Sequence, residues 1–202
     1  MSQRKQDQDK RARILIAEDD HWLSSSLVEA LSQEGYQVLG PARTGKEALE
    51  LAEIHAPDLI VMDIRMPEMD GLEAARIINQ RHFTPIVLLT AYTDPVFLER
   101  AREAKVLGYL MKPVSINELV SAIEVALNIG AQINHLEVEL ANLREKLETR
   151  KIIERAKGFL MDAYGMKEGE AMRFLQNEAK KRRVKIKVIA QAILEMAEKL
   201  RN

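Results

Sequence analysis

Short apolar runs alternate with amphipathic stretches from Ile14 to Pro113, and this alternation constrains the fold more than any other feature of the sequence. Nearly continuous apolar runs are typical of strands buried on both faces. We expect strands at 14–17, 37–40, 59–62, 86–90 and 108–111, helices at 23–33, 45–54, 71–80 and 95–104, and a fifth helix from about Ile116. Strands separated by helices indicate a parallel sheet with helices on both sides. The predicted class is therefore α/β, a five-stranded doubly wound sheet that binds ligands at the carboxyl ends of its strands.

An apolar seam follows the start of the fifth helix. Its members are spaced four, three, four, three and four residues apart: Ile129, Ile133, Leu136, Leu140, Leu143 and Leu147. This spacing predicts a coiled coil that ends near Arg150. With Ile133 at position a, Glu139 at g would pair with Arg144 at e of a second, parallel helix. The alternative is an amphipathic helix that packs on its own chain.

After Thr149 the pattern changes to three short helices, at about 150–164, 168–181 and 187–201. Gly165 suits the end of the first, because glycine adopts the left-handed conformation without steric cost. The predicted organisation is a flexible tail at 1–11, an α/β domain at 12–128, a coiled-coil linker at 129–149 and a small three-helix domain at 150–202.

Charge is unequally distributed along the chain. The net charge is −1, yet residues 150–202 hold fourteen Lys and Arg against seven Asp and Glu, which leaves −8 on residues 1–149. Opposite charge on two parts of a chain predicts two kinds of partner, with an anion such as nucleic acid for the basic part. The alternative is two solvated surfaces that differ by chance.

Several classes of protein are disfavoured by composition. No apolar run reaches the roughly 18 residues of a membrane span, so we expect no membrane partner. The polar first ten residues do not resemble a signal peptide, and cysteine is absent, so we expect a cytoplasmic protein. The four histidines are scattered and the C-terminal region shows no nucleophile and base at a telling spacing, so we do not expect an output enzyme.

Polar residues stand where the predicted strands end. Glu18 and Asp19 follow the first strand, Asp63 ends the third, Thr90 ends the fourth and Lys112 ends the fifth. Three carboxylates that converge repel one another, and a bound Mg²⁺, which prefers oxygen ligands, would offset this repulsion. A carboxylate can also attack phosphorus and form an acyl phosphate. Lys112 would then neutralise the phosphoryl oxygens, and the Thr90 hydroxyl would bond to the phosphoryl group.

These residues resemble the receiver domains of response regulators over about residues 12–128. The motifs that carry the resemblance are Glu18-Asp19, Asp63-Ile64-Arg65-Met66-Pro67-Glu68-Met69-Asp70-Gly71, Thr90-Ala91 and Lys112-Pro113. The resemblance implies a flavodoxin-like fold and phosphorylation of Asp63 by a histidine kinase. It also implies that Asp19 and Asp63 bind Mg²⁺ directly, that Glu18 acts through water, and that the Arg65 carbonyl completes the ligands.

The same resemblance implies a switch, in which Tyr109 turns inward when Thr90 moves toward the phosphoryl group. Glu18 departs from the family pattern, which usually has Asp there, and its extra methylene should alter metal affinity without removing it. Arg65 lies two residues beyond Asp63, where its bulk could slow the attack of water on the acyl phosphate.

Residues 147–194 resemble the ANTAR domain, a three-helix RNA-binding module of transcription antiterminators. The motifs that carry this resemblance are Arg150, Ile153, Glu154, Ala156-Lys157-Gly158, Leu160-Met161, Gly165-Met166, Glu170-Ala171, Leu175, Ala179 and Ala190. The resemblance implies that a phosphorylated homodimer binds paired RNA hairpins in a leader transcript and prevents a terminator from forming. The alternative is that the C-terminal helices bind a protein or DNA.

Candidate RNA contacts are basic residues on exposed faces, which bind phosphate without reading sequence. They form a first cluster of Arg150, Lys151 and Lys157 and a second within 180–187 that includes Lys181, Arg182, Arg183 and Lys185. Gly158 inside a helix suggests close approach of something to that backbone, or simple packing against a neighbour. Tyr164 is a candidate for base stacking or for packing at the helix end. Phe159 and Phe174 are expected in the core, and Lys167 is expected to cap its helix poorly.

Overall fold

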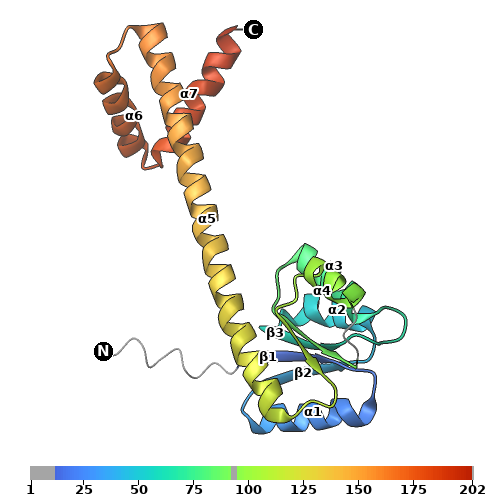
Figure 1. Ribbon diagram of the computed structural model, residues 1–202. Coiled ribbons are helices and arrows are strands. Elements are labelled where there is room, and N and C mark those ends of the chain that lie inside the picture. The colour runs from blue at the N-terminus through green and yellow to red at the C-terminus, as the bar shows by residue number, and fades with distance from the viewer. Residues whose placement is uncertain (1–11, 92–94, 202) are drawn as a thin grey trace, which may run out of the picture. The chain divides into compact units, whose positions relative to one another are not determined.

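The computed structural model describes residues 12–91 and 95–201 and divides the chain into two units, 1–134 and 135–202. The first unit contains a parallel sheet with the strand order β2-β1-β3-β4-β5 (Figure 1). The strands are β1 (Arg13–Ala17), β2 (Gln37–Ala42), β3 (Leu59–Asp63), β4 (Ile86–Thr90) and β5 (Gly108–Met111). The predicted five-stranded doubly wound sheet is confirmed, with β2 two residues longer than expected.

Helices cover both faces of this sheet (Figure 1). They are α1 (His21–Gln33), α2 (Gly45–His55), α3 (Gly71–Arg81), α4 (Pro95–Glu103) and the start of α5 (Ile116–Tyr164). Ile14 and Ile16 of β1 pack with α1 and α5, whereas Leu15 and Ala17 pack with α2, α3 and α4. Because successive side chains of a strand point to opposite faces, a strand buried on both must be apolar throughout.

Tight turns at the carboxyl edge of the sheet position the loops that carry the site. The side chains of Asp20, Thr44 and Asp70 accept hydrogen bonds from the first backbone N–H groups of α1, α2 and α3. A Cβ on Gly71 would lie 2.0 Å from the carbonyl oxygen of Asp63. Glycine is therefore required where α3 begins, because any side chain would push the helix away from Asp63.

The helix α5 is 49 residues long and spans the fifth helix, the linker and the first C-terminal helix of the sequence prediction. Its early residues Leu119 and Ile123 are fully buried in the core of the first unit, and Ala156 and Leu160 belong to the core of the second. In the intervening sequence, Leu136, Leu140, Leu143 and Leu147 are 47–61% exposed. The four leucines of the apolar seam are thus solvent-facing in this chain.

The second unit packs α6 (Glu168–Arg182) and α7 (Ile186–Arg201) with the end of α5. As expected, α5 ends directly before Gly165, whose φ is +66°. The carboxylate of Glu170 accepts a hydrogen bond from the backbone N–H of Lys167 at 2.8 Å and so helps to cap α6 from within the helix. None of the described helices has the length and apolar character of a membrane span. The predicted flexible tail at 1–11 lies outside the described residues.

Candidate functional site

An acid cluster lies at the carboxyl edge of the sheet. Glu18, Asp19 and Asp63 each offer an oxygen, and these oxygens lie within 4.8 Å of one another. Glu18 and Asp63 are buried, with 1% and 7% exposure, whereas Asp19 is exposed. The sheet register explains the convergence, since β1 and β3 pair in parallel up to Ala17 and Met62, immediately before these carboxylates.

Lys112 joins the two buried carboxylates. Its Nζ lies 2.7 Å from Oε2 of Glu18 and 2.9 Å from Oδ2 of Asp63. Burial raises the pKa of Glu18 above its ordinary value, against the opposing hydrogen bond from Lys112. Burial alone would lower the pKa of Lys112, but its bonds to Glu18 and Asp63 outweigh that effect and raise it. Lys112 is therefore a fixed positive charge beside the Asp63 carboxylate.

The second oxygen of Asp63 is oriented by the main chain. The backbone N–H of Ile64 donates to Oδ1 of Asp63 at 2.7 Å, while Lys112 binds Oδ2. Thr90 is buried at the same edge, and its carbonyl accepts a hydrogen bond from the backbone N–H of Lys112 at 2.7 Å. The strands thus bring together Glu18, Asp19, Asp63, Thr90 and Lys112.

Three other predicted features of this site concern Tyr109 and Arg65. Tyr109 is 45% exposed on β5, one residue before Leu110 pairs with Leu89 of β4. Its inward movement stays a prediction, and so does the use of the Arg65 carbonyl as a metal ligand. The side chain of Arg65 is exposed just beyond Asp63.

Sequence reasoning missed two supports of the site. The need for glycine at position 71 could have been recognised from the Asp-Gly pair that follows Asp63, since such pairs mark tight turns. The second missed support is the burial of Glu18. Its Oε1 also accepts a hydrogen bond from the backbone N–H of Asp20 at 3.3 Å. An acidic residue after a strand gives no signal of its burial.

The chemistry of the donors fits a hard divalent cation. Carboxylate oxygens are the ligands that Mg²⁺ prefers, and its usual coordination leaves several positions to water. One exposed carboxylate among the three lets water and ion reach the cluster from solvent. The acid cluster is therefore suited to Mg²⁺, with Asp19 at the open side.

The second unit presents a different surface, rich in cations. Lys181 and Arg182 keep 80% and 67% of their side chains exposed, and Arg183 and Lys185 are exposed beside them. Arg150 and Lys151 are also exposed, although Lys151 pairs with Glu148 at 2.7 Å. The predicted contacts Lys181, Arg182, Arg183 and Lys185 thus face solvent, as phosphate contacts require.

The predicted exposure of Lys157 is wrong. Lys157 is only 7% exposed, because its Nζ lies 2.7 Å from Glu168 of α6 and 2.9 Å from Glu154, one turn earlier in α5. These two carboxylates hold the ammonium group between the helices. Lys157 therefore ties α6 to α5, and its contact with RNA phosphate stays a prediction.

Gly158 and Tyr164 have the access that their predicted contacts need. A Cβ on Gly158 would meet no other group of the described residues within 4 Å. Packing within the unit therefore does not explain why this position has no side chain. Tyr164 is 63% exposed, with its ring 6.1 Å from that of Phe159 in an edge-on arrangement. Phe174, expected in the core, is 39% exposed.

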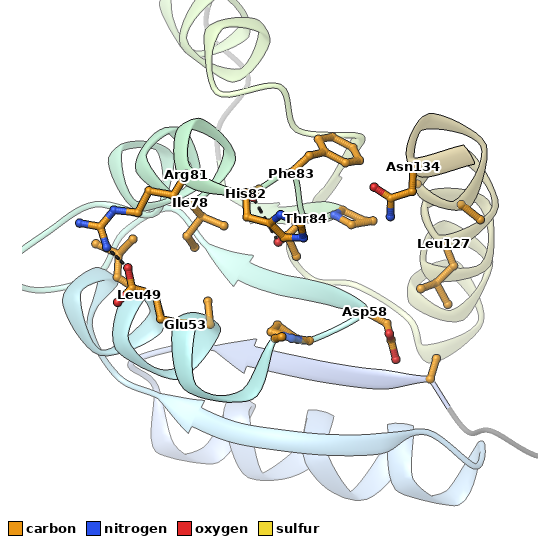
Figure 2. Close-up of a pocket in the computed structure, with 17 residues that line it drawn as sticks. Leu49, Glu53, Asp58, Ile78, Arg81, His82, Phe83, Thr84, Leu127 and Asn134 are labelled. Carbon is orange, nitrogen blue, oxygen red and sulfur yellow. Dashed lines mark hydrogen bonds and ion pairs between the residues drawn. The ribbon is translucent and has the colours of Figure 1, made fainter. Parts of the chain in front are cut away.

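A separate cavity of about 1080 Å³ lies at the opposite, amino-terminal edge of the sheet (Figure 2). The residues that precede β1, β3 and β4 line it, together with α2, α3 and α5. Figure 2 shows Arg81 directed toward Glu53, with which it forms an ion pair. Asp58 accepts a hydrogen bond from the backbone N–H of Arg13 at 2.7 Å. This cavity therefore belongs to the edge of the sheet remote from Asp63.

Comparison with known families assigns both units. Residues 14–124 match the response regulator receiver domain, and residues 141–194 match the ANTAR domain. The chain is 47% identical over 183 residues to the transcriptional regulatory protein PdtaR of Mycobacterium tuberculosis, a match that covers 91% of this chain and 89% of that protein. It is 37% identical over 117 residues to the transcriptional regulatory protein YdfI of Bacillus subtilis, covering 57% of this chain and 54% of the relative.

Solved structures resemble the first unit. The receiver domain of the putative response regulator NarL from Mycobacterium tuberculosis has a TM-score of 0.55 and 30% identity, over 59% of this chain and 98% of that one. The chemotaxis protein CheY4 of Vibrio cholerae has a TM-score of 0.55 and 28% identity, over 58% of this chain and 99% of that one.

Proposed function

Because this chain belongs to the response regulators that join a receiver domain to an ANTAR domain, we propose that a phosphoryl group on Asp63 controls RNA binding by the second unit. The observation that carries the proposal is the pairing of two sites of opposite charge in one chain. The first unit holds the acid cluster with Lys112, and the second holds the exposed cations of 180–187.

The chemistry at Asp63 is phosphoryl transfer from a histidine kinase. An oxygen of Asp63 attacks the phosphorus of the kinase's phosphohistidine, and the new O–P bond forms as the N–P bond breaks, leaving its electron pair on the histidine nitrogen. Lys112 neutralises the phosphoryl oxygens, and the Thr90 hydroxyl donates to one of them. Mg²⁺, held by Asp19, Asp63 and the Arg65 carbonyl, with Glu18 acting through water, would supply further positive charge.

Labelling with a small phosphodonor tests this step. The full chain should incorporate one phosphoryl group from radiolabelled acetyl phosphate in the presence of Mg²⁺, and Asp63→Asn should incorporate none. Asp162→Asn, which removes an exposed carboxylate from the second unit, is the matched control and should label as the wild type does. Labelling of Asp63→Asn at the wild-type level would refute the assignment.

The output is the binding of RNA hairpins in a leader transcript, which prevents a terminator hairpin from forming. Support comes from the ANTAR match and from the exposed positions of Lys181, Arg182, Arg183 and Lys185. Affinity for an RNA with two adjacent hairpins should fall steeply as salt rises, because each phosphate contact releases counterions. Equal affinity for unrelated single strands would favour the alternative, in which these helices bind a protein or DNA.

A parallel homodimer through the seam of α5 would bring two such units together. The exposed leucines of the seam would be covered by a second copy, and Glu139 of each helix would pair with Arg144 of the other. Leu140→Lys, on the seam, should shift the phosphorylated chain to monomer in sedimentation velocity. Val138→Lys, at a residue that is 61% exposed against 47% for Leu140 but lies off the seam at position f, should leave the dimer intact, and equal effects of both would contradict the coil.

A further inference from the structure

A groove with aromatic walls lies between the helices of the second unit. Its volume is about 410 Å³, within the range of roughly 300–1,000 Å³ that is usual for ligand pockets. α5, α6 and α7 all contribute, with Phe159 and Tyr164, Phe174 and Arg182, and Ala192 and Met196 in that order. Tyr164 and Met196 are each 63% exposed, so the groove is lined by large apolar groups that the fold leaves uncovered.

The groove is continuous with the cations of 180–187. Arg182 belongs to both, and its Nε donates to the carboxylate of Glu178 at 3.2 Å. Lys181 also approaches Glu178, at 3.9 Å. The single acidic residue among those that line the groove is therefore paired with cations, and it does not repel an anionic ligand at the rim.

We propose that this groove receives an unstacked base of an RNA loop, which lies against Tyr164 while Lys181, Arg183 and Lys185 bind the neighbouring phosphates. The inference rests on the proposed function and names the part of the RNA that is recognised. A nucleotide of a single-stranded loop combines a flat, largely apolar base with an anionic backbone, and an aromatic groove beside a cationic rim matches both. A peptide helix would match only the apolar part unless it also carried acidic residues.

Two local features prepare Tyr164 for this contact. Tyr164 is the last residue of α5, and the left-handed Gly165 turns the chain away directly after it. Its ring lies 6.1 Å from that of Phe159 and nearly perpendicular to it, which restricts the rotation of Tyr164 and leaves a face for a base. A stacked base requires the ring and not the hydroxyl, so phenylalanine should replace tyrosine without loss.

The test separates stacking from phosphate contacts. RNA hairpins are selected by the wild-type full chain from a pool with randomised loops, and their affinities are measured by fluorescence anisotropy at several KCl concentrations. Tyr164→Ala should weaken binding about 5- to 150-fold, the range expected for one stacked base, with an unchanged salt dependence. Ala192→Trp, which fills the groove from an exposed position, should also weaken binding, whereas Tyr164→Phe should bind within about twofold of the wild type.

Val188→Ala is the matched control, since Val188 is 49% exposed on α7 but does not line the groove. Circular dichroism of each variant verifies that its helices are retained. If the wild-type chain selects no hairpin, the proposed function and the groove assignment are both contradicted. If it selects hairpins that Tyr164→Ala and Ala192→Trp bind as tightly as the wild type does, only the groove assignment is overturned.

Discussion

The ammonium group of Lys112 lies 2.7 Å from a carboxylate oxygen of Glu18, and that carboxylate is almost completely buried. The same nitrogen also binds Asp63, so one cation holds two neighbouring carboxylates together. Without it, Glu18 and Asp63 would repel each other in a place that water reaches poorly. Lys112 is therefore a structural element of the resting pocket as well as a neutralising group for a phosphoryl oxygen.

Lys112→Ala should lower the free energy of unfolding of the first unit by about 2–3 kcal/mol. This is less than a fully enclosed ion pair loses, because Lys112 keeps 21% side-chain exposure. Hydrogen exchange of the peptides that cover β1 and β3, measured against urea, reports this change. Lys46→Ala, an exposed lysine of α2, is the control and should stay within about 0.5 kcal/mol of the wild type. Equal stabilities of both variants would contradict the role of the ion pair.

Gly71→Ala should damage both stability and chemistry. Its Cβ would lie 2.0 Å from the Asp63 carbonyl oxygen, and the backbone there has little freedom to give way. We expect a loss of about 2–3 kcal/mol in the free energy of unfolding and slower labelling by acetyl phosphate. Gly169→Ala in α6, where a Cβ would meet nothing, should cost no stability and leave labelling unchanged. Normal labelling of Gly71→Ala would show that phosphorylation of Asp63 does not need the close approach of the position-71 backbone to the Asp63 carbonyl.

The sheet and the acid cluster could be predicted because both follow from local pattern and topology. Strands buried on both faces are apolar along their whole length, so they can be recognised in the sequence. Because the strands are parallel, the residues that follow them, Glu18, Asp63 and Lys112, lie at the same carboxyl edge of the sheet. The surroundings of Lys157 could not be predicted in this way. Its partner Glu168 lies eleven residues later in another helix. Sequence spacing alone does not predict which charged side chains form ion pairs across the turn between two helices.

Acid should weaken the second unit through Glu168. The hydrogen bond from Lys157 lowers the pKa of Glu168 below its ordinary value of 4.5. A lowered pKa contributes stability that is present above pH 4.5 and lost as pH falls through the folded-state value. The melting temperature of Glu168→Gln should therefore differ most from that of the wild type at neutral pH, and the difference should shrink in acid. A difference that is constant with pH would contradict the ion pair.

Gly158→Ala should separate stability from RNA binding. Alanine has space at this position and favours a helix, so the free energy of unfolding should rise by about 0.5–1 kcal/mol. RNA affinity should nevertheless fall, because the predicted contact requires the RNA to approach the backbone at a position without a side chain. Gly169→Ala, the same change elsewhere in the unit, should leave affinity unchanged. Wild-type affinity of Gly158→Ala would remove Gly158 from the contact surface.

The most direct measurement of the central claim is the affinity of the full chain for a two-hairpin RNA with and without acetyl phosphate and Mg²⁺, in the wild type and in Asp63→Asn. The account predicts that phosphorylation tightens binding in the wild type and has no effect on Asp63→Asn. Equal affinities of the phosphorylated and unphosphorylated wild type, or the same tightening in Asp63→Asn, would contradict control of RNA binding by Asp63.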